Sequence, residues 1–243
     1  MTILDQLRIK YCIGIGDGAG SNVMVRFGMM HVARCLGVIL LNPTTNKVTM
    51  MDNLKDRFNK WKISHITPTG AQMIAFRKYG HKLEDHEDKA GALEKFKEEM
   101  AKHSLNKKNV QMYVDAFMNR VDITGKLAAE LRCDALLVVG SKSSQCAAAE
   151  YMHSHMDKVR LFCCQNESLL LTMFVLQTRT SLLKVDGVGN VVEEAPGKLA
   201  NSMLLFCKGL GWLTSVALPG VERRSSTDSE VKVWIIELLK LFF

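Results

Sequence analysis

The stretch Tyr11–Phe27 reads YCIGIGDGAGSNVMVRF. Apolar residues lead into four glycines at alternate positions, and an amphipathic segment follows directly. A backbone with so few side chains between a strand and a helix is typical of two structures, a dinucleotide-binding turn and the nucleophile elbow of a hydrolase. The remainder of the chain decides between them.

The composition indicates a globular protein in a reducing compartment. The chain has 243 residues, is 47% hydrophobic and carries a formal net charge of +7, and its basic residues are interleaved with acidic ones. No aromatic-plus-basic pattern accompanies this charge, so we predict no nucleic-acid binding. Seven cysteines without framework spacing favour free thiols. No signal peptide and no membrane-spanning apolar run is visible, so we predict a cytoplasmic protein.

Near-continuous apolar runs predict an α/β fold with a mostly parallel sheet, because strands buried on both faces lack an alternating pattern. The predicted strands are Tyr11–Gly16, Leu36–Asn42, Ala135–Gly140 and Ser181–Asp186. The helices predicted between and after them are Val23–Arg34 and Lys198–Gly209.

More than ninety residues without a strand pattern separate the second and third predicted strands. A structureless loop of that length is uncommon, so we predict a helical cap from about Pro43 to Leu131. The segments of this region with helical spacing are Met51–Trp61, Gly70–Tyr79, Lys89–Lys102 and Val110–Met118.

The dinucleotide-binding interpretation has weak support. Gly14, Gly16 and Ala19 fit the pattern G-x-G-x-x-A between a strand and a helix. The pattern also requires an acidic residue at the end of the next strand to bind the ribose, and that strand ends at Asn42. Nucleotide binding is therefore the third of three alternatives.

The hydrolase interpretation fits the turn but lacks its chemistry. The turn residues are Gly16, Asp17, Gly18, Ala19 and Gly20, and the central Gly18 stands where a hydrolase has its nucleophile. The acid is expected after the third predicted strand, where Ser143 lies, and the base after the last, where Gly189 lies. We therefore predict a hydrolase-type scaffold that is not an enzyme, with a hydrolase that uses other residues as the second alternative.

Other residues with chemical potential have simpler interpretations. His153 and His155 are two ligands without a third, so we predict no metal site and no cofactor. Four cysteines in or beside apolar runs are predicted as core residues: Cys12, Cys35, Cys133 and Cys207.

Several blocks of the chain, taken together, resemble the N-myc downstream-regulated (NDRG) family. The blocks are IGIGDGAGSNVMVRF, LGVILLNP, NRVDI at Asn119–Ile123, LRCDALLVVG and PGKLANSMLLFCKGLGW. The resemblance implies an α/β-hydrolase fold with a helical cap, no working triad and a role in cytoplasmic signalling or stress response through protein partners. It also implies a C-terminal tail phosphorylated by basophilic kinases.

The chain departs from the family pattern in two places. The family has about four further strands before the elbow, so we expect a partial fold in which the elbow strand becomes an exposed apolar edge. The segment Val159–Gln177 interrupts a pattern that is continuous in the family. We hypothesise that a retained intron encodes this insertion; a genuine extra element is the alternative.

We therefore expect an α/β-hydrolase-like domain over residues 1–218 and a tail over residues 219–243. In the tail, Arg223 and Arg224 precede Ser225 and Ser226 in a segment of almost purely polar residues. Ser226 has arginines two and three positions before it, which a basophilic kinase recognises, and Ser225 is the neighbouring candidate. The closing VKVWIIELLKLFF is too short to span a membrane.

Overall fold

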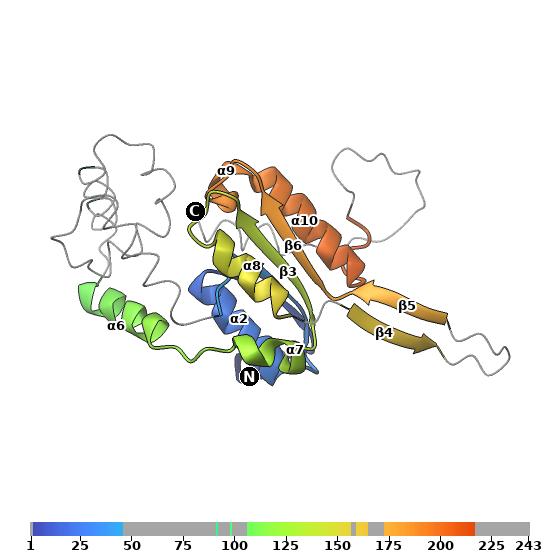
Figure 1. Cartoon of the computed structure of the whole chain (residues 1–243). Helices are drawn as coiled ribbons and strands as arrows, with labels where there is room; N and C mark the ends of the chain where they lie inside the picture. Colours follow the sequence, from blue (N-terminus) through green and yellow to red (C-terminus); the bar gives the residue numbers. More distant parts are fainter. Residues whose placement is uncertain are drawn as a thin grey trace. The chain divides into compact units, whose positions relative to one another are not determined.

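The computed structural model describes residues 2–45, 91, 98, 106–156, 159–164 and 173–216 (Figure 1). The chain divides into two compact units, Met1–Leu199 and Ala200–Phe243, and the first contains all the described strands. In chain order the elements are α1 (Thr2–Gln6), β1 (Cys12–Asp17), α2 (Ala19–Met30), β2 (Cys35–Leu41), α6 (Lys107–Met118), the 3-10 helix η1 (Thr124–Lys126), α7 (Leu127–Glu130), β3 (Asp134–Gly140), α8 (Cys146–Ser154), β4 (Val159–Cys164), β5 (Met173–Thr178), β6 (Thr180–Val185), α9 (Val191–Glu194) and α10 (Pro196–Gly209).

A parallel sheet with the order β1-β2-β3-β6 organises the first unit. Its strands agree with the four predicted runs to within one residue at either end. The inner strands β2 and β3 are buried over almost their whole length, as their continuous apolar sequences require. The predicted α/β fold with a parallel sheet is confirmed.

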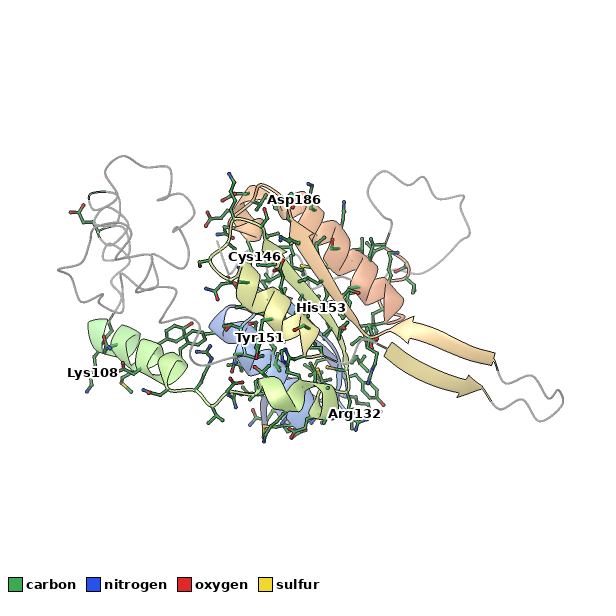
Figure 2. The ribbon with its side chains drawn as sticks, in the orientation of Figure 1. Lys108, Arg132, Cys146, Tyr151, His153 and Asp186 are labelled. Carbon is green, nitrogen blue, oxygen red and sulfur yellow. The ribbon has the colours of Figure 1, made fainter. Side chains whose placement is uncertain are left out.

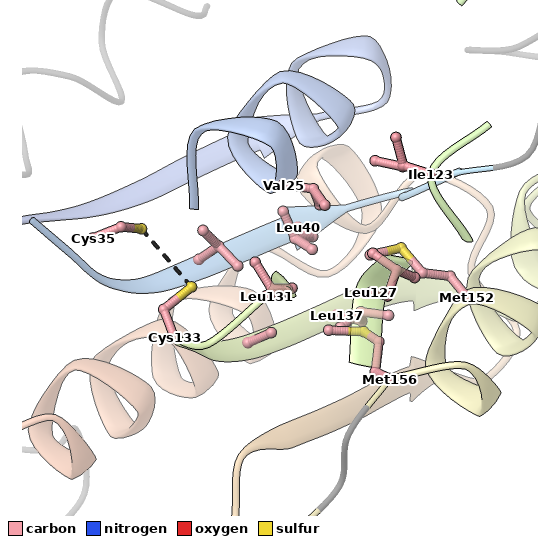
Figure 3. Packing of buried hydrophobic residues seen from close by; sticks show 12 residues of the cluster. Val25, Cys35, Leu40, Ile123, Leu127, Leu131, Cys133, Leu137, Met152 and Met156 are labelled. Carbon is pink, nitrogen blue, oxygen red and sulfur yellow. Dashed lines mark hydrogen bonds between the residues drawn. The ribbon is translucent and has the colours of Figure 1, made fainter. Parts of the chain in front are cut away.

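A cluster of buried side chains lies between the sheet and the helices α2, α7 and α8 (Figure 3). Val38 and Leu40 of β2 belong to this cluster, together with Val25 of α2 and Met152 of α8. The intervening Ile39 faces the opposite side of the sheet and is also buried. Burial on both faces therefore anchors the middle of the sheet, and helix α2 is fixed to it by Val25.

The predicted bounds of the first long helix, Val23–Arg34, are wrong. Helix α2 starts at Ala19, because Gly18 alone makes the turn from strand to helix and Ala19 and Gly20 already lie in the first helical turn. The helix ends at Met30, and the His31 N–H caps it by donating to the Phe27 carbonyl at 2.9 Å. The low helix propensity of glycine was outweighed by the packing of this turn.

Part of the predicted cap is described. Helix α6 contains the predicted segment Val110–Met118, and the Asn106 side chain caps it by accepting from the backbone N–H groups of Lys108 and Asn109. Three further segments fall wholly or almost wholly outside the described residues: Met51–Trp61, Gly70–Tyr79 and Lys89–Lys102. The extent of the cap stays a prediction.

The described residues of the segment Val159–Gln177 lie outside the parallel sheet. Strands β4 and β5 pair with each other, antiparallel, in a separate two-stranded sheet. The chain then enters the main sheet at Thr180, the first residue of β6. This topology fits an insertion between α8 and β6, whose origin stays a hypothesis.

Helix α10 contains the helix predicted at Lys198–Gly209. It begins at Pro196, since proline suits the first turn of a helix, where its missing N–H has no partner to lose. After the helix, the Trp212 N–H donates to the Cys207 carbonyl at 2.9 Å. Among the helices that the structure describes, none has the length and apolarity needed to cross a bilayer.

The elbow strand β1 lies at the edge of the sheet, as predicted. The Cys12 N–H donates to the Arg34 carbonyl in the turn before β2, and the Gly18 N–H donates to the Leu41 carbonyl at the end of β2. Backbone groups of a strand alternate in direction, so those of Ile13 and Ile15 are directed away from the sheet. The Ile15 side chain is 44% exposed. An apolar edge without proline or lysine is a template for pairing with another strand.

We predict that the purified chain self-associates through β1. Size-exclusion chromatography with light scattering should give a mass above that of the monomer that rises with concentration. Ile15→Lys should shift the protein toward monomer, because a charge at an edge opposes strand pairing. Val23→Lys is the matched control, since Val23 is exposed on helix α2 and not on the strand. A concentration-independent monomer of the unmodified chain would contradict the prediction.

Candidate functional site

The turn between β1 and α2 has the backbone conformation of a nucleophile elbow. Gly18 has φ 56° and ψ −106°, in the left-handed half of the map where glycine carries no steric penalty. Its N–H donates to the Leu41 carbonyl at 2.9 Å, and its carbonyl accepts from the Ser21 hydroxyl at 2.6 Å. The turn is therefore held from both sides, by strand β2 and by its own helix.

Two glycines of this turn have opposite surroundings. A Cβ placed on Gly16 would lie 2.4 Å from the carbonyl carbon and oxygen of Gly20 and 2.6 Å from the Ser21 nitrogen. A Cβ on Gly20 would have no atom within 4 Å. The start of α2 thus rests directly on the backbone of β1, and only Gly16 is required for that contact.

The loop after β6 returns to the end of β3. The Lys142 N–H donates to the Val188 carbonyl at 2.9 Å, and a Cβ on Gly140 would lie 2.2 Å from that carbonyl oxygen. Gly189, which the sequence predicts at the position of the general base, is buried and donates its N–H to the Glu194 carboxylate at 3.1 Å. This position therefore lies beside the end of β3, where the acid is expected.

A chain of polar side chains joins the ends of three strands. The Ser143 hydroxyl donates to Oδ1 of Asn42 at 3.3 Å, and Nδ2 of Asn42 donates to the Asp17 carboxylate at 3.0 Å. Asp17 ends β1, Asn42 follows β2 and Ser143 follows β3. The structure therefore links Asp17 of the elbow to Ser143, the predicted position of the acid, through Asn42, where the sequence pattern had indicated only a missing ribose ligand.

Asn42 carried a signal for this role. It has φ 44°, a conformation that asparagine adopts more readily than other residues with a Cβ. An asparagine at the end of a predicted strand, where the chain must turn sharply, is a candidate for such a turn. Its amide can then both donate and accept, which the chain from Asp17 to Ser143 requires.

These positions supply little for acyl transfer. Gly18 and Gly189 have no side chain, and Ser143 brings a hydroxyl where a carboxylate is expected. Acyl transfer requires a nucleophile with a base in hydrogen-bond reach. Among the described residues, no group of three or more histidine, cysteine or acidic side chains is placed to hold a metal ion.

Arg120, in the NRVDI block, packs beside the site. Its side chain is buried, its Nη1 donates to the Phe117 carbonyl at 2.6 Å, and its Nη2 donates to the Thr44 hydroxyl at 3.3 Å. The guanidinium also lies 3.9 Å from the centre of the Phe117 ring. Arg120 thus ties the end of α6 to the loop that leaves β2.

Three further contacts strengthen this connection. The Asn22 side chain donates to the Thr44 carbonyl at 3.0 Å, and Arg26 donates to the Val121 carbonyl at 2.6 Å. The Thr124 and Thr45 hydroxyls are 2.9 Å apart and buried. The two ends of the predicted cap therefore meet on the elbow helix, a function of NRVDI that the sequence pattern alone did not indicate.

A second group of polar side chains lies on α8, which also carries the labelled Cys146, Tyr151 and His153 (Figure 2). The Lys184 ammonium of β6 donates to the Glu150 carboxylate at 2.8 Å, and this hydrogen bond lowers the pKa of Glu150 and raises that of Lys184. Both side chains are solvent-exposed, so the pair adds little to stability.

Comparison with known proteins identifies the matching family. The Ndr family matches residues 1–167 and 164–214. The two matched segments overlap inside the predicted insertion Val159–Gln177, and together they contain all the described strands.

Curated relatives align with almost the whole chain. A protein of Caenorhabditis elegans is 32% identical over 233 residues, which cover 95% of this chain and 63% of that protein. Protein NDRG1-B of Xenopus laevis is 26% identical over 93% of this chain and 52% of its own length. Protein NDRG2 of Homo sapiens is 25% identical, with coverages of 91% and 53%. The chain therefore spans between half and two-thirds of the length of these relatives.

Solved structures with the same fold are α/β hydrolases. A carboxylesterase of the thaumarchaeon Nitrososphaera gargenis has a TM-score of 0.55 and 16% identity over 88% of this chain and 70% of its own. An esterase from Thermogutta terrifontis has the same TM-score and identity over 86% and 69%. At these identities the likeness concerns the fold alone, which is an α/β-hydrolase fold in part.

We predict that Gly16→Ala destabilises the protein by about 3 kcal/mol, because the new methyl group meets backbone atoms that cannot move aside. Gly20→Ala is the matched control, since it adds the same methyl group in open space. It should stabilise the protein by about 0.5–1 kcal/mol through its helix propensity. Urea denaturation followed by circular dichroism measures both changes. Equal stabilities of the two variants would show that the close contact at Gly16 does not exist.

Proposed function

The chain belongs to the Ndr family, and from this premise we propose that it is a non-catalytic protein of the α/β-hydrolase fold. In this proposal it acts in cytoplasmic signalling or stress response as an adaptor for protein partners. The observation that carries the proposal is the elbow turn at Gly18, which keeps the geometry of a nucleophile turn without a nucleophile.

The surroundings of the elbow support the same proposal. The Asp17 carboxylate and the Ser143 hydroxyl are both engaged with Asn42, so these side chains hold strand ends together. Arg120 fastens the chain after α6 to the loop after β2. A sheet edge whose polar groups bond to one another serves as a fixed base for the cap, and the cap then provides the surface for partners.

Restoring the nucleophile tests the proposal. We predict that Gly18→Ser hydrolyses short-chain aryl esters no faster than the unmodified protein, because a lone serine hydroxyl is a weak nucleophile without a base. The variant should also lose about 1–3 kcal/mol of stability, since the backbone at this position has a positive φ that favours glycine over a residue with a Cβ. Ester turnover is followed spectrophotometrically, and stability by urea denaturation.

Gly20→Ser is the matched control, since it adds the same hydroxyl in open space near the elbow. Turnover by Gly18→Ser above this control would reveal a base that we have not identified. Turnover by the unmodified chain would instead favour a hydrolase that uses other residues. A thermal shift with NAD, ATP or FAD would favour the third alternative, a nucleotide-binding protein.

The C-terminal tail provides the regulatory part of the proposal. Ser226 and Ser225 lie outside the described residues, in the sequence VERRSSTDSE. We predict that an arginine-directed kinase phosphorylates Ser226, because Arg223 and Arg224 can pair with the acidic groove of such a kinase. The phosphate would add a charge of about −1.5 to −2 beside these arginines and so change how the tail binds.

Mass spectrometry after incubation with such a kinase locates the phosphate. Arg223→Ala should reduce labelling of Ser226 strongly, whereas Lys232→Ala, beyond the recognition segment, should leave it unchanged. Equal labelling of the Arg223→Ala variant and the unmodified chain, or no labelling of either, would remove Ser226 from the proposal.

A further inference from the structure

Two cysteine thiols face each other at the amino ends of the inner strands. The Sγ atoms of Cys35, the first residue of β2, and Cys133, just before β3, are 3.9 Å apart (Figure 3). The residues are separated by 98 positions in the sequence. Both were predicted as core residues, and both are buried; their proximity is a product of the tertiary structure.

An irregularity in the register of the sheet brings them together. Cys35 pairs with Cys12 of β1, but the next pair is Ile13 with Gly37, so β2 contains one extra residue at Leu36. Side chains of a strand normally alternate between the two faces of the sheet, and one extra residue reverses this alternation for the residues before it relative to those after it. Cys35 consequently lies on the same face as Cys133, in the cluster beneath α2.

The pair fills a space next to Gly28 of helix α2. A Cβ on Gly28 would lie 3.1 Å from the Cys133 sulfur and 3.7 Å from the Cys35 sulfur. Both cysteines stand at the start of a strand, directly after an exposed or half-exposed residue, Arg34 or Arg132. Both thiols are buried, so the proposed reaction requires a local opening of the strand ends that admits a small oxidant.

The two thiols differ in acidity. The hydrogen bond between the sulfur atoms lowers the pKa of Cys35 below its ordinary value. The same hydrogen bond, followed by burial, raises the pKa of Cys133. The thiolate is the reactive form, so in the proposal below Cys35 is taken as the first nucleophile and Cys133 as the resolving residue; the 3.9 Å contact leads to the same disulfide in either order.

We propose that Cys35 and Cys133 form a reversible intramolecular disulfide when the protein meets a peroxide. In the first step the Cys35 thiolate attacks a peroxide oxygen, the O–O bond breaks, and hydrogen peroxide yields a sulfenic acid and, after protonation, water. In the second step the Cys133 sulfur attacks the Cys35 sulfur and water leaves. The two thiols lose two electrons, and the peroxide takes them up.

The reaction requires only a small movement. The sulfur atoms must approach from 3.9 Å to about 2 Å, the length of a disulfide bond. Cys12 is the cross-strand partner of Cys35, but its sulfur lies 3.8 Å from the Arg34 carbonyl oxygen, and the Cys146 sulfur lies 3.8 Å from the Glu150 carboxylate. The direct sulfur–sulfur contact makes Cys133 the proposed partner of Cys35.

The disulfide would close the chain between β2 and β3 into a covalent loop. That loop contains the predicted cap, whose ends the Arg120 contacts already join at the opposite edge of the sheet. A cross-link across so long a segment restricts the unfolded chain more than the folded one. Oxidation should therefore stabilise the protein.

Peptide mapping of the whole chain tests the proposal. The protein is treated with hydrogen peroxide, unfolded in acidic denaturant with N-ethylmaleimide so that remaining thiols cannot exchange, and digested without reductant. We expect one dominant cross-linked peptide that joins Cys35 to Cys133 and disappears on reduction. Absence of this peptide, or a dominant link through Cys12 or Cys146, would overturn the proposal.

A thermal melt provides the second measurement. The melting temperature of the unmodified chain should rise after peroxide and return to its starting value with dithiothreitol. Cys12→Ser, the matched control at a neighbouring thiol, should keep the shift, and Cys133→Ala should lose it. A shift that persists in Cys133→Ala would overturn the proposal, and the peptide map decides it even if that variant does not fold.

Discussion

The contact between Gly16 and the first turn of α2 is the constraint on which this structure depends. Because Gly16 has no Cβ, the backbone of Gly20 and Ser21 can lie against the end of β1. Helix α2 is thereby pressed onto the sheet from its first residue, and Val25 reaches the buried cluster further along the helix. In the same way, the absence of a Cβ on Gly140, at the end of β3, lets the Val188 carbonyl of the loop after β6 lie against that strand.

This constraint concerns packing and is independent of catalysis. Gly16 must be small, and the residue at Gly18 must adopt a positive φ, whether or not a nucleophile stands there. A glycine meets the second requirement with less strain than a serine does. The elbow can therefore persist as a structural turn, while the side chains of Asp17, Asn42 and Ser143 satisfy one another at the strand ends.

The carboxyl and amino ends of the parallel strands have different roles. At the carboxyl edge, Arg120 and the buried threonines connect the loop after β2 to the chain that returns toward β3. At the amino edge, Cys35 and Cys133 stand opposite each other where the same two strands begin. The long connection between β2 and β3 is thus held by hydrogen bonds at one edge, and in the proposed oxidised form by a covalent bond at the other.

The sequence by itself determined the strands, their parallel arrangement and the absence of side chains at the elbow. These features follow from local patterns: continuous apolar runs such as Leu36–Asn42 are favoured only when both faces of a strand are covered. It also predicts Ser143 and Gly189 at the positions of the acid and the base, because each follows a predicted strand. The start of α2 was predicted too late in the chain, because the low helix propensity of Gly20 argues against a helix there. The contact of Gly16 with the backbone of Gly20 and Ser21 depends on the tertiary structure, so the local sequence does not reveal it.

Only the tertiary structure decided which distant side chains meet. Asn42 reaches both Asp17 and Ser143, and Arg120 reaches Thr44, because the carboxyl ends of parallel strands come together at one edge. Cys35 meets Cys133 because one extra residue in β2 turns it toward the helical face. A register shift of a single residue reverses the direction of a side chain, and no local pattern in the sequence specifies it.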